Sequence, residues 1–306
     1  MMYKREKRLL LTVFIVPGLL LYLIFNVYPS VSGILISFFR WTGMSGTMTY
    51  IGLDNYTRFF RELTDATDFY NVRLYLTHNL FLFAFALLTV AVGLIAAAII
   101  NQKPRGHRVF RVTFFFPNIL ALPAVAMLWS MVLNPSFGLL NNSLNAAGLS
   151  NLALPWLSLQ YEMPGARLGL YTVGMISMWG GIGWFMLLFL AAIQNIPKEY
   201  FEAAVVDGAG RMRIFWSVTL PLIWETIRTV LVFQVIGALS GFALTYVLFD
   251  RTSQKHSDLI LNYYYWQAFD ARNWGYAAAI VVFIFVVTLI LTILTYIFLR
   301  RESVQY

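Results

Sequence analysis

The chain has 306 residues, of which 59% are hydrophobic and 12% are charged, with a mean hydropathy of +0.69. A soluble domain carries about 25% charged residues, so this composition predicts an integral membrane protein. The absence of cysteine excludes disulfides, thiolate zinc sites and cysteine nucleophiles, and the three histidines, His78, His107 and His256, show no metal-ligand spacing.

Six apolar runs without charged residues are each near the roughly 20 residues that a helix needs to cross the hydrocarbon core. They predict spans at 9–27, 79–100, 112–133, 168–193, 229–249 and 274–299. Four basic residues precede the first run, as in a signal peptide, but the run is long and lacks a small-x-small cleavage site. We interpret it as a retained span closed by Tyr28-Pro29. The predicted fold is all-α, with one transmembrane domain over 1–306.

Basic residues lie mainly on one side of the predicted membrane. The N-terminus, the 101–111 loop, the 194–221 loop and the C-terminal tail hold 13 of the 22 Lys and Arg residues but only five acids, which accounts for the whole net charge of +8. The positive-inside rule makes this side, with both termini, cytoplasmic. Because topology explains all the excess charge, we do not expect nucleic-acid binding.

The cytoplasmic loop 194–221 favours two short helices. Pro197 fits the first turn of a helix over 198–206, and Gly208 can adopt the left-handed conformation that ends one. A second helix over 211–218, interrupted by Pro221, would complete a helix-turn-helix parallel to the membrane.

Glu202 would be an exposed anion on this loop, with Arg211 and Arg213 nearby. Such a carboxylate suits a charge-assisted contact with an arginine of another protein. The alternative is an ordinary amphipathic interfacial helix.

The spacing of this loop resembles a known signature. Glu202-Ala203-Ala204, three residues ending at Asp207, Gly208, and then Leu220-Pro221 about a dozen residues later are similar to the cytoplasmic "EAA" signature of permease subunits in binding-protein-dependent ABC importers. Val218 stands where that family usually has Ile.

Resemblance to the carbohydrate-type permease subunits extends over roughly residues 10–300. The N-terminus is similar to the first of two permease partners, the maltose- and glycerol-3-phosphate-type "F/A" subunit. The segment starting at Phe249-Asp250 departs from the Thr-x-Gly-Gly-Pro of many relatives. The matching segments are Ile51-Gly52-Leu53-Asp54-Asn55-Tyr56, Phe137-Gly138-Leu139-Leu140-Asn141, Trp156-Leu157, Trp179-Gly180, Gln194-Asn195-Ile196-Pro197 and Gly275-Tyr276-Ala277-Ala278-Ala279.

This resemblance implies a type I ABC importer permease fold in a prokaryotic inner membrane. It implies a second homologous permease, two cytoplasmic ABC ATPase subunits and an extracytoplasmic solute-binding protein as partners, and a sugar, oligosaccharide, polyol or glycerol-phosphate as solute. The chain has no Walker motif, so we expect it to be no enzyme and to bind no cofactor, with ATP and Mg held by the ATPase subunits. The residues implied in ATPase coupling are Glu202, Ala203, Ala204, Asp207, Gly208, Leu220 and Pro221.

The same resemblance implies a solute pathway, because the maltose-type relative lines a sugar site near mid-membrane with its fourth and fifth spans. The corresponding residues here are Ser177, Gly180, Gly181, Trp184, Gly237, Ala238, Ser240 and Gly241. The spacing places Ser177, Gly181 and Trp184 on one helical face, and Trp184 offers a stacking surface for a sugar ring. The fifth-span positions that are polar in the maltose-type subunit are Ala and Gly here, so this half of the site would be a roomy wall and the partner permease would supply the hydrogen bonds. The alternative is that the glycines allow close packing of the helices and that the tryptophan only fills space.

Other interpretations remain open. Tyr263-Tyr264-Tyr265-Trp266 fits either a membrane-interface aromatic belt or a carbohydrate-stacking platform. Charged residues in the first outer segment, among them Arg58, Glu62, Asp65 and Asp68, fit a solvated helix or a landing surface for the binding protein. An ABC importer for a non-carbohydrate solute is the nearest alternative. A secondary transporter would be expected to carry ionisable residues within its spans, and a membrane enzyme a polar cluster at one depth; neither pattern occurs in the six runs.

Overall fold

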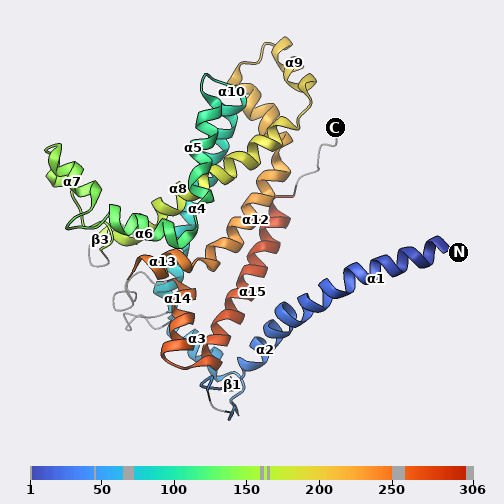
Figure 1. Cartoon of the computed structure of the whole chain (residues 1–306), viewed down its shortest axis with the longest axis vertical. Coiled ribbons are helices and arrows are strands. Elements are labelled where there is room, and N and C mark those ends of the chain that lie inside the picture. Colours follow the sequence, from blue (N-terminus) through green and yellow to red (C-terminus); the bar gives the residue numbers. More distant parts are fainter. Residues whose placement is uncertain are drawn as a thin grey trace. The chain divides into compact units, whose positions relative to one another are not determined.

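The computed structural model describes residues 2–44, 46–64, 72–158, 162–163, 166–249 and 259–300, almost all of them in helices (Figure 1). The strands in this part form two short antiparallel pairs, β1 (Phe39–Arg40) with β2 (Thr49–Tyr50) and β3 (Glu162–Met163) with β4 (Ala166–Arg167). The contacts group the chain into two compact units, Met1–Thr67 with Tyr263–Val286, and Asp68–Asn262 with Val287–Tyr306. The single-domain interpretation stays a prediction.

The first helix of the chain is longer than predicted. It comprises α1 (Met2–Tyr22), a π-helical turn η1 (Leu23–Val27) and α2 (Tyr28–Ile36), so Tyr28-Pro29 does not close the span. The Tyr28 amide donates to the carbonyl of Leu23, five residues earlier. A proline normally breaks a helix because its ring clashes with the carbonyl four residues back; we attribute the continuation to this wider turn, which ends at Val27, two residues before Pro29.

Two of the recognised segments meet in the first unit. The Asn55 amide, on α3 (Asp54–Thr64), donates to the carbonyls of Ser37 (2.8 Å) and Phe39 (3.1 Å). A Cβ at Gly275, near the start of α15 (Trp274–Phe298), would lie 1.9 Å from the same Phe39 carbonyl oxygen. Asn55 and Gly275 are therefore needed for the close packing of α3 and α15 against the backbone at Ser37 and Phe39.

The second unit contains the remaining long helices. Its elements are α4 (Val72–Asn101), α5 (His107–Ile119), α6 (Leu122–Val132), α7 (Leu139–Ala146), η2 (Ser150–Leu152), α8 (Leu168–Gln194), α9 (Lys198–Val206), α10 (Arg211–Ile214), η3 (Phe215–Thr219), α11 (Leu220–Leu222), α12 (Trp224–Ser240) and α13 (Ala243–Leu248). Helices α4 and α8 make the most extensive contact, and α5 crosses α8 closely. A Cβ at Gly183 would lie 2.1 Å from the Phe114 carbonyl oxygen, so only glycine allows this crossing.

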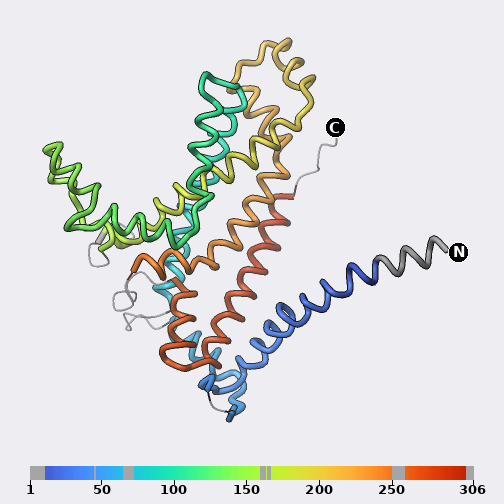
Figure 2. Tube along the Cα trace, viewed as in Figure 1, coloured from blue at the N-terminus to red at the C-terminus, as the bar shows by residue number. Residues whose placement is uncertain are grey.

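The third predicted span, 112–133, is not one straight helix. Helices α5 and α6 meet at an angle of 100°, and the green segment in Figure 2 turns at this point. Leu120 and Ala121 adopt extended conformations, with ψ of 137° and 135°, between Pro117 and Pro123. Pro123 is tolerated because it lies in the first turn of α6, where its missing N–H is not needed.

The fifth predicted span, 229–249, begins earlier and is also interrupted. Helix α12 starts at Trp224, so it includes Arg228, which is 8% exposed, paired with Glu225 and placed 4.4 Å from the centre of the Tyr296 ring. The helix ends before Gly241 and Phe242, which separate it from α13.

In the described ranges, four helical stretches are long and apolar enough to cross a membrane, and each bent pair adds one if it counts as a span. The four are Leu11–Ile36, Val72–Asn101, Leu168–Gln194 and Trp274–Phe298, and the pairs are His107–Ile119 with Leu122–Val132 and Arg211–Leu222 with Trp224–Ser240. Six spans are thus compatible with the structure, two of them broken.

Candidate functional site

Helix α9 projects from the end of α8 as predicted. It covers Lys198–Val206, the predicted range, directly after Pro197. Phe201 packs against the apolar cluster formed by α4, α8 and the start of α12. This anchor holds one face of the short helix against the second unit.

The turn after α9 is a Schellman motif. The Gly208 amide donates to the Val205 carbonyl (3.0 Å), and the Ala209 amide donates to the Ala204 carbonyl (2.9 Å). Gly208 has a φ of +75°, the left-handed conformation expected of it. Two otherwise free carbonyls at the end of the helix are satisfied in this way.

The second helix of the loop runs further than predicted. It continues through Pro221 to Leu222, and the chain bends by 69° at Ile223 instead. The π-helical turn η3 directly precedes Leu220, whose amide donates to the Phe215 carbonyl five residues back. As at Pro29, we attribute the continuation to this wider turn. Ile223 is buried in the apolar cluster, so the bend is held by packing.

The outer face of the helix-turn-helix combines a carboxylate with apolar side chains. Glu202 is exposed, and Val206 is 86% exposed. Within the described ranges, neither Arg211 nor Arg213 forms an ion pair with Glu202. The carboxylate is therefore available to a group outside this chain. An exposed apolar tip beside it is a feature of surfaces that contact another protein.

A cavity of about 270 Å³ lies within the second unit, among α4, α8 and α12. Ser177 and Gly181 line it from α8, and Gly237, Ala238 and Gly241 line it from the end of α12 and the break that follows. The structure therefore brings together five of the eight residues predicted for the solute pathway.

The other three predicted residues lie elsewhere. Trp184 does not line the cavity and is 52% exposed, so it does not share the cavity face with Ser177 and Gly181. Gly180 has no atom within 4 Å of where its Cβ would be, and its carbonyl accepts a hydrogen bond from Asn118 (3.2 Å). The Ser240 hydroxyl donates to the Ile236 carbonyl (2.8 Å). Their part in a pathway stays a prediction.

Sequence reasoning missed the contribution of α4, whose Phe83, Phe85 and Thr89 also line the cavity. It also missed Gln234, which donates from Nε2 to the Ala86 carbonyl (2.9 Å) and whose Oε1 lies 3.9 Å from the position of a Cβ at Gly237. A polar amide inside an apolar run is the signal that could have found it, because polar groups within spans need a partner.

Asn79 is a second such amide and fixes the end of α12. Its Nδ2 donates to the Ala238 carbonyl (2.7 Å), and its Oδ1 accepts from the amide of Ile260 (3.0 Å) at the start of α14 (Ile260–Tyr265). These bonds hold the broken end of α12 beside the cavity.

The aromatic segment 263–266 does not form one exposed platform. Tyr263 is buried, and its hydroxyl donates to Glu62 (2.8 Å); Tyr276 also donates to Glu62, and Arg58 pairs with it. Burial, followed by the charge of Glu62, raises the pKa of Tyr263 well above its usual range. Trp266 is the one exposed member of the four in this structure. Asp65 and Asp68, expected on the same outer segment as Glu62, lie outside the described residues.

Comparison with known proteins supports a permease. Residues 89–304 match the family described as "Binding-protein-dependent transport system inner membrane component". The "Probable ABC transporter permease protein YurN" of Bacillus subtilis is 31% identical, with 94% of this chain and 95% of that protein covered. The "Diacetylchitobiose uptake system permease protein NgcF" of Streptomyces coelicolor is 31% identical, covering 91% of this chain and 78% of that one. The "Trehalose/maltose transport system permease protein MalF" of Thermococcus litoralis is 29% identical over 91% and 90% of the two chains.

A solved structure has the same fold. A chain of a bacterial ABC transporter involved in the import of the acidic polysaccharide alginate superimposes with a TM-score of 0.81, at 24% identity over 99% of both chains. This likeness confirms the all-α permease fold of type I ABC importers. The protein is a permease subunit rather than an enzyme, and its chain belongs to the family of inner membrane components of binding-protein-dependent transport systems.

Proposed function

We propose that this permease subunit forms half of the pathway for a sugar, an oligosaccharide or a related polyol or glycerol-phosphate. The observation that carries the proposal is the 270 Å³ cavity lined by Ser177, Gly181, Gly237, Ala238 and Gly241. Several relatives bear names of carbohydrate systems, for diacetylchitobiose, multiple sugars, arabinooligosaccharides and trehalose/maltose. Pockets for small ligands usually measure about 300–1,000 Å³. The cavity of about 270 Å³ is slightly smaller than that range. A second, homologous permease would therefore have to complete the site for any solute larger than one sugar ring.

The chemistry of the cavity suits a solute with hydroxyl groups. The aromatic faces of Phe83 and Phe85 can cover the apolar face of a sugar ring. The Gln234 amide nitrogen is already bonded to Ala86, which leaves its oxygen to accept a hydrogen bond from a hydroxyl. The Ser177 hydroxyl supplies a further polar group at the wall.

The helix-turn-helix would couple this pathway to ATP hydrolysis. Two cytoplasmic ABC ATPase subunits, which would bind ATP and Mg, would dock on α9 and α10 through Glu202, Ala203, Ala204, Asp207 and Gly208, with Leu220 and Pro221 continuing the loop. Helix α8 runs without a break from Ser177 past Gly181 to Gln194, and Gly181 lies about 20 Å along the helix from that end. A displacement of α9 would therefore be transmitted through α8 to the cavity wall. Closure of the ATPase subunits would in this way switch the solute pathway between its inward-facing and outward-facing states.

The extracytoplasmic partner would be a solute-binding protein, and both termini of the permease would be cytoplasmic in a prokaryotic cell membrane. One solved relative is described as a complex with an alginate pentasaccharide-bound periplasmic protein. An importer for a non-carbohydrate solute is the second candidate, because the relative YurN is described only as a probable ABC transporter permease, with no solute in its name.

The test is to express the complex with its binding protein and to screen that protein for thermal stabilisation. A ligand that binds only the native state raises the unfolding temperature. We expect stabilisation by at least one mono- or oligosaccharide, polyol or glycerol-phosphate, and uptake of that solute by proteoliposomes. Stabilisation by amino acids or peptides alone would reject the proposed substrate class.

A further inference from the structure

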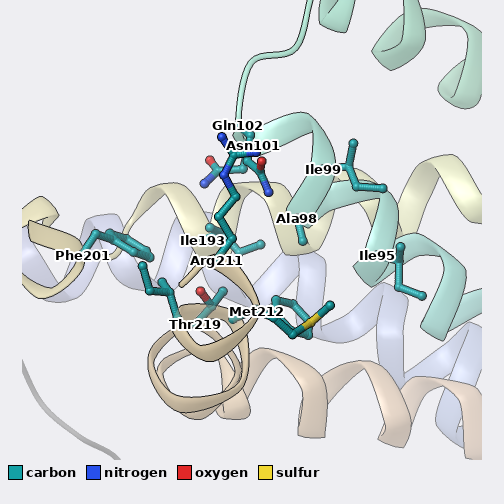
Figure 3. Close-up of a pocket in the computed structure, with 12 residues that line it drawn as sticks. Ile95, Ala98, Ile99, Asn101, Gln102, Ile193, Phe201, Arg211, Met212 and Thr219 are labelled. Atoms are coloured by element: carbon teal, nitrogen blue, oxygen red, sulfur yellow. The ribbon is translucent and has the colours of Figure 1, made fainter. Parts of the chain in front are cut away.

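A second cavity, of about 490 Å³, lies in the same unit beside the helix-turn-helix (Figure 3). Its walls come from the last turns of α4, from Ile193 of α8, from Phe201 of α9, and from α10 and η3. It shares no lining residue with the cavity around Ser177 and Gly181. The proposed solute pathway therefore does not account for it.

One end of this cavity is polar and positively charged. Asn101 ends α4 there and Gln102 follows it, and the Arg211 side chain points toward them in Figure 3. No carboxylate lines the cavity, and Arg211 has no ion pair among the residues that the structure describes. Lys103 and Arg105 follow Gln102 in the next turn, which adds positive charge. A negatively charged group is therefore favoured at this end.

The rest of the cavity is apolar and open to the surface. Ile95 and Ile99 are each 55% exposed, and Met212 is 71% exposed. Ala98 lies between the two isoleucines on the same wall. Apolar side chains exposed in a single groove indicate an apolar occupant.

The position along α4 matches the boundary between lipid chains and headgroups. The 30 residues of α4 measure about 45 Å, which exceeds the roughly 30 Å of the hydrocarbon core, so its last turns reach the headgroup level. From Ile95 to Asn101 the helix rises about 9 Å, with apolar residues first and an amide last. An occupant with an apolar chain and an anionic head would meet both parts of the groove.

We propose that this cavity binds one anionic phospholipid, with an acyl chain along Ile95, Ile99 and Met212 and its phosphate against Arg211. Basic pockets between membrane helices on the cytoplasmic side bind such headgroups. The lipid would lie directly behind α9 and α10, against the same helices that position the Schellman turn. The packing of the coupling helices would then depend on the lipid composition of the membrane.

The experiment uses the assembled transporter, purified in mild detergent with phosphatidylglycerol or phosphatidylcholine as the probe, and counts retained lipid by native mass spectrometry. Arg211→Gln removes the charge at the polar end, and Ala98→Trp fills the apolar part. Arg213→Gln is the matched control, because it removes an exposed arginine of the same short helix that does not line the cavity.

We expect wild type and Arg213→Gln to retain phosphatidylglycerol in preference to phosphatidylcholine, and both cavity variants to retain it at least about tenfold more weakly. Equal retention by Arg211→Gln and Arg213→Gln would overturn the proposal. Retention unchanged in Ala98→Trp would mean a headgroup contact at the surface and no chain in the cavity, which also overturns it. A photo-crosslinker at Ile99 that captures a protein subunit instead of lipid would assign the groove to that subunit.

Discussion

The turn after α9 offers a sharp test of how the permease transmits movement. Gly208 has a φ of +75°, and no atom lies within 4 Å of the position that its Cβ would take. Gly208→Val therefore causes no clash, and its cost is backbone strain alone. An L-residue in the left-handed region costs about 1–2 kcal/mol, and more for a β-branched side chain. If the turn avoids this strain, the hydrogen bonds from Gly208 to Val205 and from Ala209 to Ala204 are lost.

Gly210 provides the matched control two residues along. It also has no atom within 4 Å of its Cβ position, but its φ is −70°, which any residue adopts. Gly210→Val should therefore leave the turn intact. The comparison separates the effect of conformation from the effect of adding an exposed valine to the loop.

The assay is ATP hydrolysis by the purified transporter, stimulated by the solute-loaded binding protein, together with solute uptake in proteoliposomes. A strain of 1–2 kcal/mol changes a population ratio by a factor of about 5–30, so we expect Gly208→Val to lower both rates by a factor in that range. Gly210→Val should behave as wild type, and Gly208→Asn should be intermediate, because asparagine tolerates the left-handed conformation. Wild-type rates in Gly208→Val, or equal losses in both valine variants, would refute the reasoning.

Three further outcomes are expected. Glu202→Ala should weaken ATPase docking by roughly 1.5–3 kcal/mol through loss of a charge-assisted hydrogen bond, measured by co-purification of the ATPase subunits; undiminished docking would show that the carboxylate makes no such contact. Gly241→Leu should block uptake while basal ATP hydrolysis persists, because a Cβ there already lies 3.2 Å from Leu259 in the cavity wall; uptake at the wild-type rate would count against the pathway. A cysteine replacing Ala209 should resist an impermeant maleimide in intact cells while one replacing Ser158 is labelled, and external labelling at Ala209 would reverse the proposed orientation.

Local features of this chain were predictable from its sequence because they depend on neighbouring residues. The range 198–206 for α9 and the left-handed Gly208 follow from a proline before the helix and a glycine after it. The long apolar runs follow from the thickness of the membrane. The recognised segments also led to five residues of the cavity, although the resemblance rather than any physical pattern carried that prediction.

The helix breaks and continuations depended on tertiary structure. Proline alone predicts an interruption at Pro29 and Pro221, yet the helices continue through both, after a π-helical turn. The actual bends lie at Leu120, at Ile223, where packing into the apolar cluster holds the chain, and at Gly241. A sequence pattern does not encode these positions, because they depend on contacts between distant residues.

The composition of both cavities was likewise decided by tertiary packing. A membrane helix that is apolar on all sides carries no stripe that distinguishes its buried face from its exposed one. The sequence alone therefore did not reveal that α4 lines one cavity with Phe83 and Phe85 and another with Ile95 and Ile99. The sequence determined that the chain is a helical membrane protein whose 194–221 loop resembles a known signature, whereas side-chain contacts between distant helices decided where the two cavities lie.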